Sequence, residues 1–408
     1  MAKALWGQIY LFDDLAGTLR QEPGGAYSFV YDPTYLNLGK PAIAHTLPVR
    51  EAPYISAVGL HPFFDNLVSE GWLRAAQARA LGINADDRFA LLLAFGHDCA
   101  GAVSIRDPDP LPDLRLDPAD AESMAALTSR ASLSGIQAKL MVVRAPRGYR
   151  PAGPRETSTH IAKLNSGQLP SLVELEYLTS LATRRLLPEE EVPAIEIGTV
   201  GDVAKDVLIV ERFDRLPKGG KRHFEEFAQL LGVKAADKYV GNYADMARFI
   251  RNTPGTAAAE VERLFRRLLA CLLLGNTDAH LKNFAMFHTA TGLRLTPQYD
   301  LVASAYYKQF QTIALDIAKV RDMRLGDLEA KHVMGMAEDF GLSEATLKLA
   351  LKDIQSRLDN AKTAIEKSDV GQKQMKDEII KLVEKRWNGT FSLIGQRLSK
   401  RRAAAERK

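Results

Sequence analysis

The sequence has few cysteines and no long apolar run. Only Cys99 and Cys271 occur among 408 residues, and both lie in apolar surroundings. We therefore expect two buried thiols rather than a disulfide, which favours a reducing compartment, the cytoplasm. No apolar run approaches the ~18 residues of a membrane span. The first residues, MAKALWGQIYLFDD, show no apolar segment or cleavage site of a secretory signal, so we expect neither export nor membrane contact.

Net charge is also small, only +4, which gives no argument for nucleic-acid binding by the chain as a whole. Basic residues do gather in residues 397–408, RLSKRRAAAERK, where six lysines and arginines accompany one glutamate. A solvated, frayed tail is the favoured interpretation of such a run. Contact with the phosphates of a nucleic acid is the alternative.

The chain divides into three regions by composition. Residues 1–110 combine strand patterns, GQIYLF and AYSFVYD, with a helical stretch that starts at Pro62 and another at RFALLLAFG, which indicates a small α+β subdomain. The proline-rich RDPDPLPDLRLDP forms the first boundary. Residues 120–240 are strand-rich, and one helix, SLVELEYLTSLATRRLL, interrupts the strands. Residues 241–408 are helical.

One long helix is expected in this last region. Ser343 is a plausible N-cap, and Ile354, Leu358, Ala361 and Ile365 mark its buried face. A strand-rich lobe followed by a helical lobe is one arrangement that holds a nucleotide, although many two-domain proteins share this order.

Residues 264–300 contain the groups that point to chemistry. An apolar helix ending at Gly275 precedes the polar loop NTDAHLKNF, and a strand–turn–strand then returns the chain beside that loop. Protein kinases place a catalytic aspartate five residues before a Mg²⁺-binding asparagine, with a second metal-binding aspartate after a hairpin. Asp278, Asn283 and Asp300 follow this order. The pattern predicts phosphoryl transfer from ATP, with Mg²⁺ held by hard oxygen ligands. A capped helix end with ordinary polar residues is the alternative.

Upstream segments offer parts of a nucleotide pocket. The turn SLSGIQAKL contains Ser134 and Gly135, whose backbone amides could cradle phosphates, and it ends at Lys139. A plain hairpin turn would look the same. Lys163, in the strand HIAKL, and Glu176, in the following helix, are candidates for the ion pair with which kinases hold the α- and β-phosphates. Singly, each is more often a surface charge.

Together these motifs resemble the HipA family of bacterial serine/threonine kinase toxins, which are encoded beside a helix-turn-helix antitoxin. The matching segments are SLSGIQAK, ELEYL, VERFDR, EEFAQLLGVKAADKY, TDAHLKNF and LTPQYD, with LPVREAPY, LHPFFDNLVSEGW and FGHDCAGAVSI nearer the N-terminus. The resemblance spans residues 5–365 and implies an α+β, two-lobed protein-kinase-like fold with an extra N-terminal subdomain and an all-α C-terminal lobe.

The resemblance also implies roles for residues of the helical lobe. Asp278 would be the catalytic base, and Asn283 and Asp300 would bind Mg²⁺. The order His280-Leu281-Lys282 differs from ordinary protein kinases, where the lysine lies nearer the aspartate. Lys282 is our choice for contact with the γ-phosphate.

In the strand-rich lobe, the resemblance implies that Lys163 contacts the ATP phosphates. The segment 211–214 follows a strand where a hinge between lobes would fall, and the backbone of Glu211 and Phe213 would bind adenine. The ribose would meet Asp214 from this segment and His280 from the helical lobe.

Self-modification is implied in the loop that closes over ATP. Ser132 matches the serine that the family autophosphorylates, whereas Ser134 departs from the family, whose best-known member has alanine there. Either serine, or both, is therefore a candidate.

The family phosphorylates aminoacyl-tRNA synthetases, which stalls translation, but no residue here identifies the target. The resemblance implies a HipB-like antitoxin as partner and contact with operator DNA through it. Two other functions stay open: a kinase for a small molecule, and a non-enzymatic co-repressor that binds the antitoxin and DNA.

Overall fold

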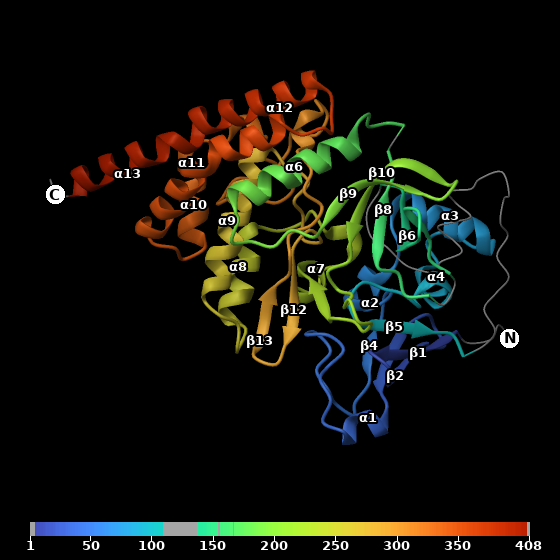
Figure 1. Ribbon diagram of the computed structural model, residues 1–408. Coiled ribbons are helices and arrows are strands. Elements are labelled where there is room, and N and C mark those ends of the chain that lie inside the picture. The colour runs from blue at the N-terminus through green and yellow to red at the C-terminus, as the bar shows by residue number, and fades with distance from the viewer. Residues whose placement is uncertain (1–4, 109–136, 154–155, 166, 406–408) are drawn as a thin grey trace. The chain divides into compact units, whose positions relative to one another are not determined.

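The computed structural model describes residues 5–108, 137–153, 156–165 and 167–405 (Figure 1). The chain forms two compact units. One consists of Met1–Gln168 and Pro193–Lys238, and the other of Leu169–Val192 and Tyr239–Lys408. The sequence had placed residues 169–192 in the strand-rich region, but they pack with the helical unit.

The first unit begins with a five-stranded sheet in the order β4-β3-β2-β1-β5, in which neighbouring strands are antiparallel. Alternate residues of its strands, such as Ile9 and Leu11, enter a buried core, as the period of two requires. The two strands expected from GQIYLF and AYSFVYD are present. The strands are β1 (Trp6–Leu11), β2 (Asp14–Gln21), β3 (Tyr27–Tyr31), β4 (Tyr54–Ser56) and β5 (Val103–Arg106).

Four short helices accompany this sheet. The helical stretch expected after Pro62 is two helices, because Val68 adopts an extended conformation and Gly71 has a positive φ of 53°. The segment RFALLLAF forms one helix, as expected. The helices are α1 (Pro33–Asn37), α2 (Pro62–Leu67), α3 (Gly71–Leu81) and α4 (Arg88–Phe95).

The rest of the first unit is built on a closed barrel in the order β10-β8-β6-β7-β9. A single parallel pairing, β7 with β9, closes it. Leu73 of α3 belongs to its core, so the N-terminal subdomain and the barrel share buried surface. The elements are β6 (Lys139–Arg144), β7 (Tyr149–Pro151), β8 (His160–Lys163), β9 (Ile195–Val200) and β10 (Ala204–Glu211), followed by β11 (Phe224–Glu226), α7 (Phe227–Leu230) and the 3₁₀ turn Ala235–Asp237.

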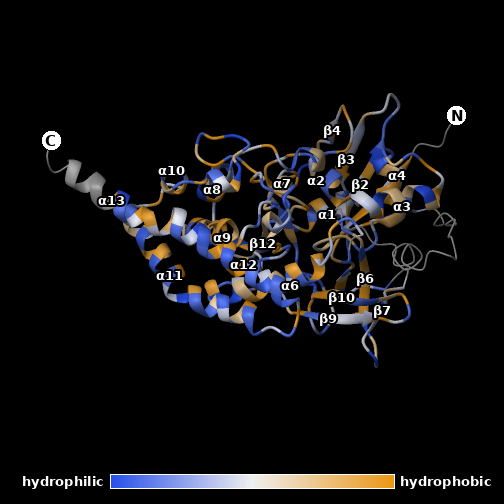
Figure 2. Cartoon of the chain, turned by 90° about the horizontal axis from the view of Figure 1, so that it is seen from above, coloured by the Kyte–Doolittle hydropathy of each residue, from blue (hydrophilic) through white to orange (hydrophobic). Residues whose placement is uncertain are grey.

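The second unit is mainly helical. Helix α6 packs along α11, and both contact α9, which explains why residues 169–192 belong here. Helix α11 carries both hydrophobic and hydrophilic residues along its length (Figure 2). Ser343 caps α11 and its expected apolar face is buried, as predicted. The elements are α6 (Leu172–Leu186), α8 (Tyr243–Asn252), α9 (Ala259–Leu274), β12 (Ala285–Thr289), β13 (Gly292–Leu295), the 3₁₀ turns Ser304–Tyr306 and Leu325–Asp327, α10 (Ala330–Asp339) and α11 (Glu344–Glu366).

A last pair of helices, α12 (Lys373–Arg386) and α13 (Ser392–Ala405), is joined by the π-helical turn Trp387–Phe391. The basic run that was expected to be a frayed tail is therefore helical as far as Ala405. Within the residues that the structure describes, no helix is both long and apolar enough to cross a bilayer.

Both cysteines are buried and free, as the sequence predicted. Burial raises the pKa of each thiol to about 12, so neither is a reactive thiolate near neutral pH.

Candidate active site

Helix α9 delivers the polar loop of the second unit. Its apolar residues are buried through Leu274, and Gly275 ends it in the left-handed conformation with φ 90°. Glycine adopts this conformation without the steric cost that a Cβ brings. A Cβ at Gly275 would also lie 2.7 Å from the Arg386 guanidinium, which itself donates to the Leu273 carbonyl. The start of the loop is thus held by the backbone conformation of Gly275 and by the side chain of Arg386.

Asn276, buried within this loop, connects two of the candidate carboxylate residues. Its side-chain oxygen accepts the Asp278 N–H at 3.2 Å, and its amide donates to the Asp300 carbonyl at 3.3 Å. The two segments lie 24 residues apart in sequence. The expectation that the hairpin would bring Asp300 back to the loop is confirmed.

The side chain of Asp278 is exposed, whereas its neighbours Ala279 and His280 are buried. The hydroxyl of Tyr239 donates to Asp278 Oδ1 at 2.8 Å, and the ring of Tyr239 meets His280 edge-on at 4.9 Å. Tyr243 is buried and donates to the Ala279 carbonyl at 2.9 Å. A carboxylate that is accessible yet held by a fixed donor suits a general base.

The loop leads directly into the hairpin of β12 and β13 (Figure 1). After it, the hydroxyl of Tyr299 donates to the Lys282 carbonyl at 2.8 Å, which ties the returning chain to the loop. Asp300 has a positive φ of 53°, a strained conformation for a residue with a side chain. Such strain is often found at functional sites.

Asn283 offers an oxygen atom that suits a metal ion. Its side-chain oxygen is buried and accepts no hydrogen bond, although a buried polar atom left unsatisfied costs on the order of 1–3 kcal/mol. A hard cation would satisfy this amide oxygen. Asp300, half-buried and tied to the same loop, supplies a carboxylate. The oxygen ligands that Asn283 and Asp300 offer therefore fit Mg²⁺.

In the first unit, Lys139 and Lys163 lie opposite each other on the paired strands β6 and β8. Directly opposed residues of antiparallel strands point to the same face. Both lysines are almost fully buried, with exposed fractions of 8% and 4%. Two buried cations on one face favour an anionic group such as a phosphate. Ser132, Ser134 and Gly135 of the expected phosphate loop lie outside the described residues.

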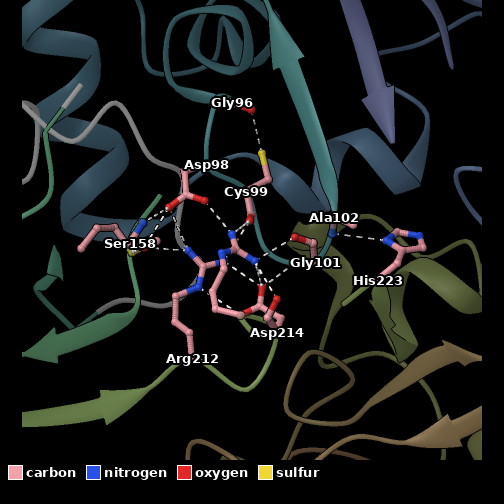
Figure 3. A network of polar contacts seen from close by, with 11 residues as sticks. Gly96, Asp98, Cys99, Gly101, Ala102, Ser158, Arg212, Asp214 and His223 are labelled. Atoms are coloured by element: carbon pink, nitrogen blue, oxygen red, sulfur yellow. Dashed lines mark hydrogen bonds and ion pairs between the residues drawn. The ribbon is translucent and has the colours of Figure 1, made fainter. Parts of the chain in front are cut away.

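The hinge segment after β10 is anchored by a network of ion pairs (Figure 3). Arg212 bonds to Asp98 and to Asp214, and Arg215 bonds to the same two carboxylates. The Asp214 carboxylate also accepts the Gly101 N–H at 2.8 Å. Four donors engage this buried carboxylate, so its contacts are those of a structural residue. Contact with ribose, expected for Asp214 from the sequence, would require it to leave these partners.

The other hinge residues are more accessible. Glu211 is exposed and ends β10, and its N–H donates to the Ala194 carbonyl. The ring of Phe213 lies 5.1 Å from that of Phe224.

The candidate residues thus fall into two groups. The second unit holds Asp278, His280, Lys282, Asn283, Asp300 and Glu176, and the first holds Lys139, Lys163, Glu211, Phe213 and Asp214. Because Lys163 and Glu176 belong to different units, their ion pair stays a prediction.

Sequence reasoning missed Asn276, within the loop, and also Tyr239 and Tyr299, which contact the loop. Only Asn276 had a local signal, as a polar residue directly after the helix-ending Gly275. The tyrosines reach the loop from positions 39 and 17 residues away from their partners, which no local pattern reveals.

Comparisons with known proteins agree on one family. A family model described as the HipA-like C-terminal domain matches residues 131–362, and the HipA N-terminal domain matches residues 7–106. Y4dM of Sinorhizobium fredii, whose name proposes a kinase activity, is 29% identical over 366 residues. The match covers 83% of this chain and 87% of Y4dM. The serine/threonine-protein kinase toxin HipA of Shewanella oneidensis is 26% identical over 400 residues, covering 88% and 89%.

A solved structure supports the fold. A chain of the Shewanella oneidensis complex of HipA, HipB and operator DNA superposes with a TM-score of 0.77 at 23% identity, covering 95% of this chain and 99% of that chain. The α+β, protein-kinase-like fold expected from the sequence is confirmed.

Proposed function

The chain belongs to the HipA family, and from this premise we propose that it is an ATP- and Mg²⁺-dependent serine/threonine protein kinase of a toxin–antitoxin system. The observation that carries the proposal is the single loop that holds Asp278, Asn283 and, through Asn276, Asp300. Its exposed carboxylate and unsatisfied amide oxygen supply two of the features that phosphoryl transfer uses: a proton acceptor and a hard metal ligand.

The loop residues then take separate roles. Asp278 accepts the proton of the substrate hydroxyl and holds that hydroxyl toward the phosphate. Asn283 and Asp300 hold Mg²⁺, which when bound neutralises charge on the ATP phosphates. Lys282 supplies a positive charge for the transferred group.

The remaining candidate residues take roles in binding the nucleotide. Lys139 and Lys163 bind its phosphates, and Glu176 pairs with Lys163. The backbone of Glu211 and Phe213 binds adenine, and His280 contacts the ribose. Asp214 acts indirectly, because its bonds to Arg212 and Arg215 fix the hinge to the N-terminal subdomain.

The proposed phosphorylation sites, protein target and partner rest on the resemblance to the HipA family. Ser132 and Ser134 are the proposed sites of self-phosphorylation, and the proposed protein target is an aminoacyl-tRNA synthetase, so that translation and growth are inhibited in the cytoplasm. A HipB-like antitoxin is the proposed partner, with operator DNA bound through it. The solved complex of the Shewanella oneidensis relative, which contains HipB and operator DNA, supports this partner.

Replacing the proposed base tests the kinase activity. Asp278→Asn removes the proton acceptor while keeping the size of the side chain, so phosphoryl transfer should fall by about 10²–10⁴-fold with Mg-ATP binding retained. Mass spectrometry after incubation with Mg-ATP measures transfer, and growth on overexpression measures toxicity.

The matched control is Asp339→Asn, an exposed aspartate at the end of α10 in the same unit. It should transfer phosphate at the wild-type rate. Equal transfer by Asp278→Asn and wild type would reject Asp278 as the base. No transfer by either protein would reject the kinase mechanism and favour the non-enzymatic co-repressor.

A further inference from the structure

Tyr239 places a hydroxyl on the carboxylate proposed to act as the base. Its Oη lies 2.8 Å from Asp278 Oδ1 and donates to it. A general base must lie within hydrogen-bond reach of the proton that it removes, about 2.6–3.2 Å between heavy atoms. The phenol of Tyr239 therefore has the relation to Asp278 that a substrate hydroxyl needs.

The surrounding contacts hold Tyr239 in this position. Its ring packs edge-on against His280, two residues after Asp278. Just beyond it, the Gly241 carbonyl accepts the Asp316 N–H at 3.0 Å, and the Asn242 amide donates to the Ala318 carbonyl at 2.7 Å. The chain is thus anchored within three residues of the tyrosine.

The pair is also accessible. Tyr239 is 48% exposed and the side chain of Asp278 is exposed. Other hydroxyls near the loop are engaged elsewhere: Tyr243 is buried on the Ala279 carbonyl, and Thr277 contacts Ser304 and the Phe310 carbonyl.

We propose that Tyr239 is a phosphorylation site of the protein's own active centre. The inference rests on the proposed kinase function and adds one tyrosine, held against the base, to its serine and threonine acceptors. Tyr239 Oη attacks the γ-phosphorus of ATP, and an O–P bond forms there. The bond from this phosphorus to the β,γ-bridging oxygen breaks, and ADP leaves with the electron pair. The phenolic proton passes to Asp278 Oδ1.

Phenol chemistry favours this acceptor. The pKa of an unperturbed tyrosine is about 10, within reach of a positioned carboxylate base during transfer. The product carries about −1.5 to −2 charges next to the Asp278 carboxylate. Because like charges repel, the modified side chain would turn toward solvent, where its exposed position leaves room.

Peptide mapping after incubation with Mg-ATP tests the proposal. Trypsin cleaves after Lys238 and Arg248 and releases YVGNYADMAR, which contains both Tyr239 and Tyr243. Fragmentation of this peptide should place phosphate on Tyr239 and none on Tyr243, so the buried tyrosine serves as the matched control. Tyr239→Phe keeps the ring against His280 and should give an unmodified peptide.

Asp278→Asn should reduce labelling of Tyr239 by about 10²–10⁴-fold. The fraction labelled at a given time should be independent of protein concentration, because the acceptor and the base lie in one unit of one chain. Labelling that rises with protein concentration would overturn transfer within one chain.

The outcomes separate this inference from the proposed function. Phosphate on Ser132, Ser134 or a protein substrate with none on Tyr239 would overturn the inference and leave the kinase standing. Absence of transfer to any residue would reject the kinase proposal and the inference with it.

Discussion

Two polar clusters in this protein both contain aspartates and differ in how completely their acceptor oxygens are hydrogen-bonded. The hinge network of the first unit pairs Arg212 and Arg215 with Asp98 and Asp214, all buried (Figure 3). The loop of the second unit, by contrast, exposes the Asp278 carboxylate and leaves a buried oxygen of Asn283 without a hydrogen bond.

The charges of the hinge network stabilise one another. Burial alone would raise the pKa of Asp98, but the guanidinium groups of Arg212 and Arg215 outweigh it and hold that pKa well below its usual range. Asp214 shows the same balance and the same direction. Both carboxylates therefore remain ionised at neutral pH.

The difference indicates what each cluster does. A network whose acceptors are filled by protein donors holds structure and has no capacity for a ligand. In a loop with an accessible carboxylate and a buried oxygen that accepts no hydrogen bond, the unsatisfied oxygen lowers stability, and a bound ligand can remove this loss. Polar residue types alone do not separate these roles. The hydrogen bonding of the acceptor oxygens does, since Arg215 Nε, a buried atom of the hinge network without a hydrogen-bond partner, is a donor.

The largest expected effect is on stability, in the hinge network. Arg212→Met would leave Asp98 and Asp214 short of partners in a buried site, so the free energy of unfolding should fall by about 3–5 kcal/mol. Denaturant unfolding measures it. Arg150→Met is the control in the same unit, because Arg150 pairs with Glu156 at the surface and its loss should change stability little.

If Arg212→Met and Arg150→Met were equally stable, the hinge network would not be the structural cluster that we infer.

A smaller effect is expected at the metal ligands. Asn283→Ala or Asp300→Ala should weaken Mg²⁺-dependent ATP binding by roughly 10–100-fold. Loss of a metal ligand should lower the affinity at least as much as loss of a residue that supports such a ligand. Calorimetry with and without Mg²⁺ measures this loss.

Asn283→Asp is the matched control, because it keeps an oxygen ligand and should keep Mg²⁺-dependent binding. In contrast to Arg212→Met, Asn283→Ala should not lower the free energy of unfolding without ligand, since it removes an unsatisfied buried oxygen. Unchanged affinity in both alanine variants would exclude these residues as metal ligands.

The smallest effect concerns Asn276, which touches neither nucleotide nor substrate in the proposed mechanism. Asn276→Ala should lower the transfer rate by roughly tenfold, because hydrogen bonds worth ~1 kcal/mol each no longer fix Asp278 and Asp300.

Asn276→Asp sharpens the test. It keeps the acceptor for the Asp278 N–H and loses the donor to the Asp300 carbonyl. Transfer at saturating Mg²⁺ should therefore recover, whereas Mg²⁺ affinity should stay reduced. Equal defects in both variants would mean that Asn276 supports the loop as a whole rather than through two separable bonds.

The sequence by itself determined the local features of this protein. Helix α9 and its end at Gly275 follow from apolar residues at helical spacing and a glycine that tolerates positive φ. The hairpin that returns Asp300 follows from two short strand patterns around a glycine turn. Such features depend on neighbours within a few residues, so they can be read directly from residue order.

Only the tertiary structure decided the contacts that give these residues their partners. Asp98 meets Arg212 across 114 residues, and Tyr239 meets Asp278 across 39. Residues 169–192 join the helical unit because α6 packs on α11, far along the chain. Long-range packing selects such partners from many charged and aromatic residues of similar type, and periodicity carries no information about that choice.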